Sequence, residues 1–142
     1  MSWRDTTSKL AQDELDNLLN VALGFAQRQL SEHGAFFPYA AAISIKGAPE
    51  MIASRPSESH VQPHADDILV SCFSTLTDRR EVIRAGAVVS DVRVLDGGDA
   101  IRVDLEHSEG VAIVALLPYT RANKQIRYGN IQALVGQRQI WA

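Results

Sequence analysis

Apolar residues recur every three to four positions near the start of the chain, a spacing typical of a helix with one buried face. The residues that make this stripe are Leu15, Leu18, Leu19, Ala22, Phe25 and Ala26. Acidic residues stand early in the segment and Gly34 follows it, as helix termini prefer. The pattern predicts a helix over residues 9–32.

A hairpin of two short strands is predicted next. Apolar residues alternate along residues 36–46, and Gly47-Ala48-Pro49 separates them from a second apolar run at residues 51–53. A glycine and a proline between apolar runs favour a turn. Residues 55–63 are rich in serine and proline and are expected to form a loop.

A second helix is predicted from about Pro63 to Gly86. Proline suits the first helical position, and Asp66 and Asp67 complement the helix dipole. The apolar stripe of this helix consists of Leu69, Cys72, Phe73, Leu76 and Ile83. On that stripe Cys72 is expected to be a small buried residue rather than a reactive thiol.

The rest of the chain is predicted to be sheet. Residues 88–94 contain four β-branched valines, and residues 101–106 alternate cleanly between apolar and charged side chains. Residues 111–117 are apolar on both faces, as in a strand that is covered on both sides. Residues 126–135 suit a strand or a helix, and a strand is favoured because Gly129 and Gly136 bracket a length more typical of a strand. Residues 139–141 are a candidate last strand.

The expected architecture is a single α+β domain over residues 1–142 with the order α-β-β-α-β-β-β-β. Short turns between consecutive strands favour antiparallel pairing. Two amphipathic helices on one face of that sheet would give a two-layer sandwich.

Composition restricts the protein class. Hydrophobic residues make up 46% and charged residues 22%, close to globular averages. One cysteine allows no intramolecular disulfide, which favours a reducing compartment. The chain starts without a basic leader and an apolar run, and its longest apolar stretch is far shorter than the ~20 residues that cross a bilayer. A cytoplasmic protein without membrane contact is expected.

Charge is unevenly distributed. The net charge of −3 argues against nucleic acid as a partner. All 17 acidic residues lie at or before Glu109, and later charges are only basic: Arg121, Lys124, Arg127 and Arg138. This asymmetry fits a basic segment folded against an acidic body or, alternatively, a local anion site.

The most suggestive polar cluster is formed by His60, His64, Asp66 and Asp67. Histidines four residues apart can share a helix face and bind a transition metal, and His33 or His107 could add a ligand. His60, however, precedes the predicted helix, and the two acids have an independent role at the helix start. A metal site at His60, His64 and Asp66 therefore stands as an alternative to an ordinary loop.

A second charged group lies on the predicted strand 101–106. Arg102, Asp104 and Glu106 share one face, which is expected to be solvated or to form the rim of a dimer interface. His107 points to the opposite face, so Glu106 and His107 are not a natural acid–base pair. Nucleophile-elbow, P-loop and dinucleotide-binding motifs are absent from the sequence, and no catalytic residue or cofactor is expected.

The C-terminal half carries the pattern DAIRVDLEH…G…LPY…YG…IW, which begins at Asp99 and ends at Trp141. The pattern resembles that of small bacterial α+β proteins of unknown function, and this resemblance implies no catalytic residue. The order of elements is also similar to that of roadblock-like and profilin-like modules, which are often dimeric binding scaffolds.

The leading hypothesis is a non-enzymatic binding or regulatory domain that forms a homodimer through a sheet edge or the charged face near Arg102, Asp104 and Glu106. One alternative is a small metal-binding protein or enzyme that uses His60, His64 and Asp66. Another is a partner-specific inhibitor or immunity-type protein, which would be marked by a large exposed apolar patch.

Overall fold

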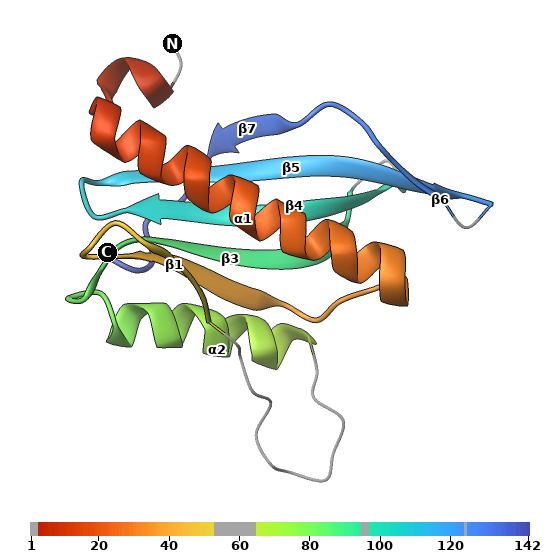
Figure 1. Ribbon diagram of the computed structural model, residues 1–142, viewed down its shortest axis with the longest axis horizontal. Coiled ribbons are helices and arrows are strands. Elements are labelled where there is room, and N and C mark those ends of the chain that lie inside the picture. Colours follow the sequence, from red (N-terminus) through yellow and green to blue (C-terminus); the bar gives the residue numbers. More distant parts are fainter. Residues whose placement is uncertain (1–2, 53–64, 95–96, 124) are drawn as a thin grey trace, which may run out of the picture.

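A computed structural model describes residues 3–52, 65–94, 97–123 and 125–142. It contains a short 3-10 helix η1 (Trp3–Thr6), helix α1 (Lys9–His33), helix α2 (Ala65–Asp78) and seven strands. The strands are β1 (Tyr39–Ser44), β2 (Pro49–Ile52), β3 (Ile83–Arg93), β4 (Asp99–His107), β5 (Val111–Ala122), β6 (Gln125–Tyr128) and β7 (Gln132–Val135). They form one antiparallel sheet in the order β2-β1-β3-β4-β5-β6, with β7 also paired to β5 (Figure 1). The predicted α+β class is confirmed.

Helix α1 begins and ends where the sequence predicts. The Ser8 hydroxyl accepts a hydrogen bond from the backbone N–H of Ala11 at 3.1 Å, which caps the N-terminus. Gly34 adopts a left-handed φ of 75° and its N–H reaches the Leu30 carbonyl at 2.9 Å.

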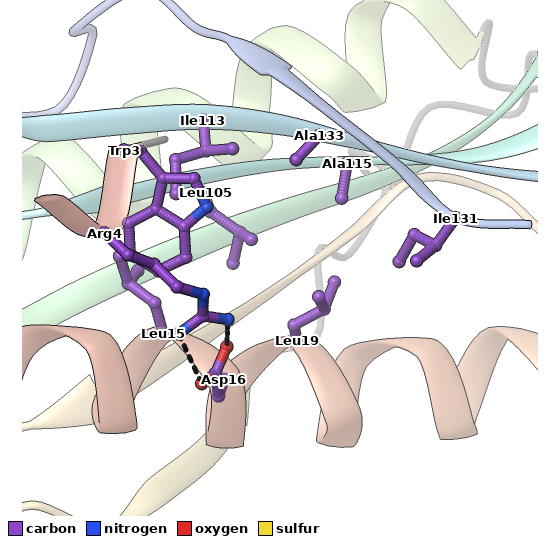
Figure 2. A pocket seen from close by; sticks show the side chains of 10 residues that line it. All are labelled: Trp3, Arg4, Leu15, Asp16, Leu19, Leu105, Ile113, Ala115, Ile131 and Ala133. Atoms are coloured by element: carbon purple, nitrogen blue, oxygen red, sulfur yellow. Dashed lines mark hydrogen bonds and ion pairs between the residues drawn. The ribbon is translucent and has the colours of Figure 1, made fainter. Parts of the chain in front are cut away.

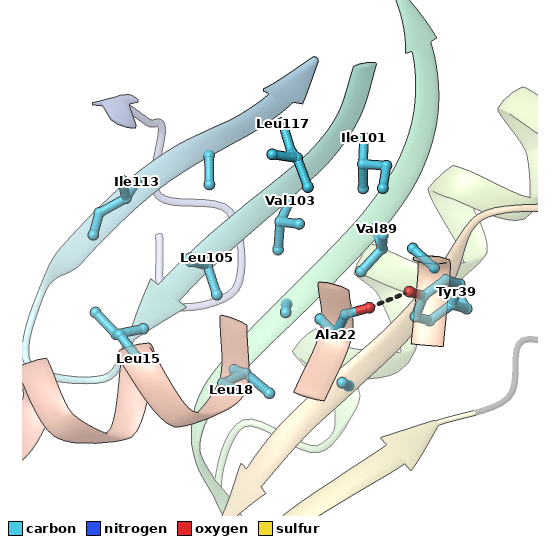
Figure 3. Packing of buried hydrophobic residues seen from close by; sticks show 14 of the residues in the cluster. Leu15, Leu18, Ala22, Tyr39, Val89, Ile101, Val103, Leu105, Ile113 and Leu117 are labelled. Carbon is cyan, nitrogen blue, oxygen red and sulfur yellow. Dashed lines mark hydrogen bonds between the residues drawn. The ribbon is translucent and has the colours of Figure 1, made fainter. Parts of the chain in front are cut away.

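The apolar stripe of α1 builds the main core against β1, β3, β4 and β5 (Figure 3). Leu15, Leu18 and Ala22 are buried there against Val103 and Leu105 of the sheet. The Tyr39 hydroxyl donates to the Ala22 carbonyl at 2.5 Å, which satisfies a polar group inside this core.

Helix α2 lies on the opposite face of the sheet from α1, so the predicted arrangement with both helices on one face is wrong (Figure 1). Ile68, Cys72 and Leu76 pack on Ala40 and Ala42, which alternate with the α1-facing residues of β1. Strands β1 and β3 are therefore sandwiched between two helices. Cys72 is fully buried, as predicted.

The second helix ends earlier than the sequence predicts. It stops at Asp78, and Ile83 begins β3 and is buried in the α2-side core. Its apolar side chain fits the helical spacing equally well, which explains the error. Arg84 consequently lies on a strand and not at a helix C-terminus.

The C-terminal third also differs in detail from the prediction. Residues 126–135 are not one element but contribute to two short strands, β6 and β7, that pair with different parts of β5. Strand β5 continues through residues 119–122, beyond the apolar run 111–117 that predicts it. Residues 139–141 form no strand.

Candidate functional site

Strand β7 forms an open edge of the sheet. It pairs with β5 from Ile113↔Val135 to Leu116↔Gln132, and no strand of the described chain lies on its other side (Figure 1). All four of its residues are exposed, and none is charged. Exposed, uncharged edge strands are templates for pairing with another chain.

The backbone of β7 has a defined direction at this edge. The N–H of Gly136 donates to the Ala112 carbonyl at 3.0 Å, which makes Leu134 and Gln132 the residues that bond to β5. The N–H and C=O groups of Ala133 and Val135 therefore point away from the sheet. Gly136 is required for this approach, because a Cβ there would lie 2.9 Å from the Ile113 nitrogen.

An apolar cavity of about 150 Å³ lies beside this edge, between α1 and the sheet (Figure 2). Its walls come from η1, the first turns of α1, β4, β5 and the segment leading into β7. A bidentate pair between Arg4 and Asp16, at 2.7 and 3.0 Å, closes one side. The lining residues are Trp3, Arg4, Leu15, Asp16, Leu19, Leu105, Ile113, Ala115, Ile131 and Ala133.

Exposed apolar side chains lie along β7 and in the residue before it, Ile131, which lines the cavity. Ile131 and Leu134 are about half exposed, and Val135 is 96% exposed. Ala133 and Val135 stand opposite Ala115 and Ile113, two residues of the α1-side core, so their side chains lie on the α1 face. Leu134 lies on the other face. The cavity, Ile131 and Val135 thus lie on the α1 face, and Leu134 adds an apolar side chain on the opposite face of the same edge.

A buried charged cluster ties α1 to the ends of β3 and β4. Nε2 of His107 lies 2.9 Å from Oε1 of Glu14, and Nη2 of Arg84 lies 2.5 Å from Oε2 of the same carboxylate. The second contact is electrostatic, because Glu14 Oε2 and the buried Nε of Arg84 make no aligned hydrogen bond within the described residues. The sequence prediction did not include this cluster.

The ring of His107 is fully engaged. Its Nδ1 accepts a hydrogen bond from the Glu109 N–H at 3.1 Å, so the proton resides on Nε2 and is donated to Glu14. The residue is only 2% exposed. Since both ring nitrogens are occupied, the arrangement is suited to holding α1 in place and not to proton transfer with a substrate.

Glu106, predicted to be solvated, is buried by the C-terminal residues. Its carboxylate accepts hydrogen bonds from the backbone N–H groups of Gln139, Ile140 and Trp141 at 2.7, 2.9 and 2.8 Å. The backbone of residues 139–141 is therefore held by a side chain and not by a strand partner. This explains why that segment, predicted as a candidate strand, is not one.

Of the other members of the predicted charged face, Arg102 is exposed and Asp104 is partly buried. Arg102 is paired with Asp104 through two hydrogen bonds of 3.0 Å. They lie beside a broad open depression of about 960 Å³ that Arg102, Leu116 and Pro118 help to line. Its two cations, Arg102 and Arg93, each face a carboxylate of the chain, Asp104 and Asp99, so this depression offers little attraction to an anion.

The predicted metal ligands are only partly within the described residues. His60 and His64 lie outside them, and Asp66 is exposed in the first turn of α2. His107 faces α1 on the other side of the sheet, so it does not join Asp66. Among the residues that the structure describes, no group of three or more His, Cys, Asp or Glu side chains could hold a metal ion.

Burial raises the pKa of each tyrosine. The pKa of Tyr119 rises to about 12, first because burial removes the phenolate from water and then because its hydroxyl donates to Asp91 at 2.6 Å. Burial likewise raises the pKa of Tyr39 and Tyr128. All three are held protonated at neutral pH and are suited to packing.

No family model, curated protein or solved structure matches this chain. The resemblance of its C-terminal half to small bacterial proteins thus stays a prediction. No helix in the described residues is long and apolar enough to cross a membrane.

Proposed function

We propose that this chain is a non-enzymatic binding domain that works as a homodimer, with β7 as the dimer interface. The observation that carries the proposal is the open β7 edge, where the backbone groups of Ala133 and Val135 point outward from an exposed, uncharged strand. Pairing of two such edges satisfies these groups and buries apolar side chains.

The opposite edge of the sheet is a poorer interface. Strand β2 begins with Pro49, which has no N–H to donate, followed by the charged Glu50. Both features discourage strand pairing. The difference between the two edges supports the choice of β7 as the side where a second chain binds.

A binding role is further supported by how the buried polar groups are used. The carboxylates of Glu14 and Glu106 and the ring of His107 all hold elements of the fold together. The large apolar residue with the highest exposed fraction among the described residues, Val135 at 96%, lies instead at the strand edge. A cytoplasmic location remains part of the proposal, on the strength of a single buried cysteine.

The molecular mass in solution tests this proposal. Native mass spectrometry at micromolar concentration should give twice the chain mass of 15.6 kDa. Val135→Lys should give a monomer, because it places a charge on the interface without disturbing the core. Met51→Lys, which places the same charge on β2, should leave the dimer intact. A monomeric wild-type protein would refute the proposed homodimer.

A monomeric result would favour a partner-specific interaction protein, such as an inhibitor or immunity-type protein. The exposed Ile131, Leu134 and Val135 support this second candidate, since the same edge can accept a strand of another protein. One partner that co-purifies with the wild-type chain and is lost from Val135→Lys would establish it. Metal binding by His60, His64 and Asp66 stays a prediction, which the metal content of the purified protein tests.

A further inference from the structure

We infer that β7 pairs antiparallel with β7 of a second copy about a two-fold axis at Leu134, and that Val135 of each copy covers the apolar cavity of the other. The inference rests on the proposed homodimer and adds its register. Three features carry it: the direction of the backbone groups, the position of the cavity and the exposure of Val135.

The backbone groups select the register. In an antiparallel pair, residues whose N–H and C=O groups face the partner stand opposite each other and exchange two hydrogen bonds. On β7 these residues are Ala133 and Val135. An axis at Leu134 sets each of them opposite the other in the second copy, so every outward group of the strand is bonded. An axis at Ala133 or Val135 pairs one with itself and leaves the other facing a residue outside β7.

This register brings Val135 of one copy to the cavity of the other. Val135 then lies opposite Ala133 of the second copy, on the α1 face. Ala133 and the neighbouring Ile131 line the cavity there (Figure 2). A cavity of about 150 Å³ is large enough for a benzene-sized apolar group, so it accommodates the branched end of a valine. Val135, which is 96% exposed in the single chain, is thereby covered in the dimer.

The side chains on the other face of the joined sheet also fit this register. Leu134 meets Leu134 of the second copy as a pair without mutual backbone bonds, the type in which side chains come closest. Both leucines are half exposed in the single chain. Since β7 carries no charge, two identical strands meet without repulsion.

Cysteine cross-linking tests the register. In Leu134→Cys the two thiols face each other across the axis, so oxidation with diamide should convert the protein into a disulfide-linked dimer. In Val135→Cys the two residues are diagonal neighbours about 7–8 Å apart, beyond the reach of a disulfide, and the protein should stay uncross-linked. The native Cys72 is fully buried and gives little background.

Each result has a separate meaning. A cross-link at position 134 alone supports the inferred register. A cross-link at position 135 alone means that the dimer uses β7 in another register, and overturns the inference but not the homodimer. A dimeric wild-type mass without either cross-link means that another surface is used, which also overturns it. A monomeric wild-type mass removes the proposed function itself.

The contact between Val135 and the cavity is tested by Val135→Ala. Removing two methyl groups from each copy should raise the dimer dissociation constant at least about ten-fold. The unfolding of the monomer should be unchanged, because the side chain is almost fully exposed there. Val70→Ala, an exposed valine on α2, should leave dimerisation unaffected. Equal dissociation constants for Val135→Ala and wild type would refute the contact.

Discussion

Two buried carboxylates, Glu14 and Glu106, connect parts of the chain that lie far apart in sequence. Glu14 joins α1 to His107 of β4 and Arg84 of β3, whereas Glu106 binds the backbone of residues 139–141. A carboxylate removed from water is tolerated only when its oxygens are paired, and here the pairs are protein groups. These buried polar residues thus hold a helix, two strands and the C-terminal segment in place.

Glu14→Ala should lower the free energy of unfolding by about 2–4 kcal/mol, because it leaves His107 without its acceptor and Arg84 without its counter-charge. Asp13→Ala removes a carboxylate from the adjacent position of α1, where it makes an exposed pair with Lys9, and should change stability by about 0.5 kcal/mol or less. Urea unfolding of both variants measures the difference. Similar losses for the two would contradict the anchoring role.

Alkaline pH should destabilise the fold through Tyr119. Its pKa is about 12 in the folded chain against 10 for an unperturbed tyrosine, so the unfolded chain ionises first. The contribution of Tyr119 to the free energy of unfolding is complete below pH 10 and is lost as the pH rises from 10 to about 12. Tyr119→Phe should flatten this part of the stability curve, with Tyr39 and Tyr128, whose pKa values are also raised by burial, supplying the remaining slope. An unchanged curve measured by circular dichroism would show that Tyr119 does not contribute.

At the scale of elements, predictability depends on whether the signal is local. The ends of α1 follow from Ser8 and Gly34, two residues that act within one turn of the helix. The predicted end of α2 is wrong because Ile83 fits a helical stripe and a strand equally well. The placement of α2 was also wrong, although β1 is apolar on both faces, a pattern that indicates cover on both sides.

Glycine at position 86 permits β3 to lie close to α2 and the C-terminal residues. A Cβ there would lie 2.7 Å from Cδ1 of Ile140 and 3.2 Å from Cδ1 of Leu76. Gly86→Ala should therefore destabilise the protein by about 1–3 kcal/mol. Gly24→Ala, in the interior of α1 with no atom near its Cβ, should stabilise it by about 0.5–1 kcal/mol. Thermal unfolding of both tests this, and the same sign for both would be inconsistent with the packing.

At the scale of the whole molecule, the sheet is covered unevenly. It has helices on both faces at β1 and β3, but the buried core on the α2 side contains no residue of β4 or β5, and β7 has no neighbour beyond it in the described chain. Sequence patterns predict the class and most strands, because periodicity is local. Which strand lies at the edge depends on long-range pairing, so the β7 surface could not be predicted.

The buried cluster was partly visible in the sequence. Glu14 occupies a position on the α1 stripe, three residues after the buried Ala11 and four before Leu18. His107 continues the core-facing alternation of Ile101, Val103 and Leu105. Each is thus a polar residue on a buried face, but the partnership between two residues 93 positions apart requires the fold.

A homodimer joined through an uncharged strand makes a prediction about the stability of the whole protein. The urea midpoint should rise with protein concentration, since association stabilises the folded chain by mass action. The dimer dissociation constant should change little between low and high salt, because no charge lies on β7. In Val135→Lys the midpoint should not depend on concentration. A strong salt dependence in the wild type would point to a charged interface.

The hydrogen bonds from residues 139–141 to Glu106 have a consequence for synthesis of the chain. Ile140 belongs to the α2-side core, yet it follows every helix and strand in chain order. On the ribosome, α2 is therefore made long before one of its packing partners. The α2-side core is expected to stay incomplete until Ile140 has left the exit tunnel.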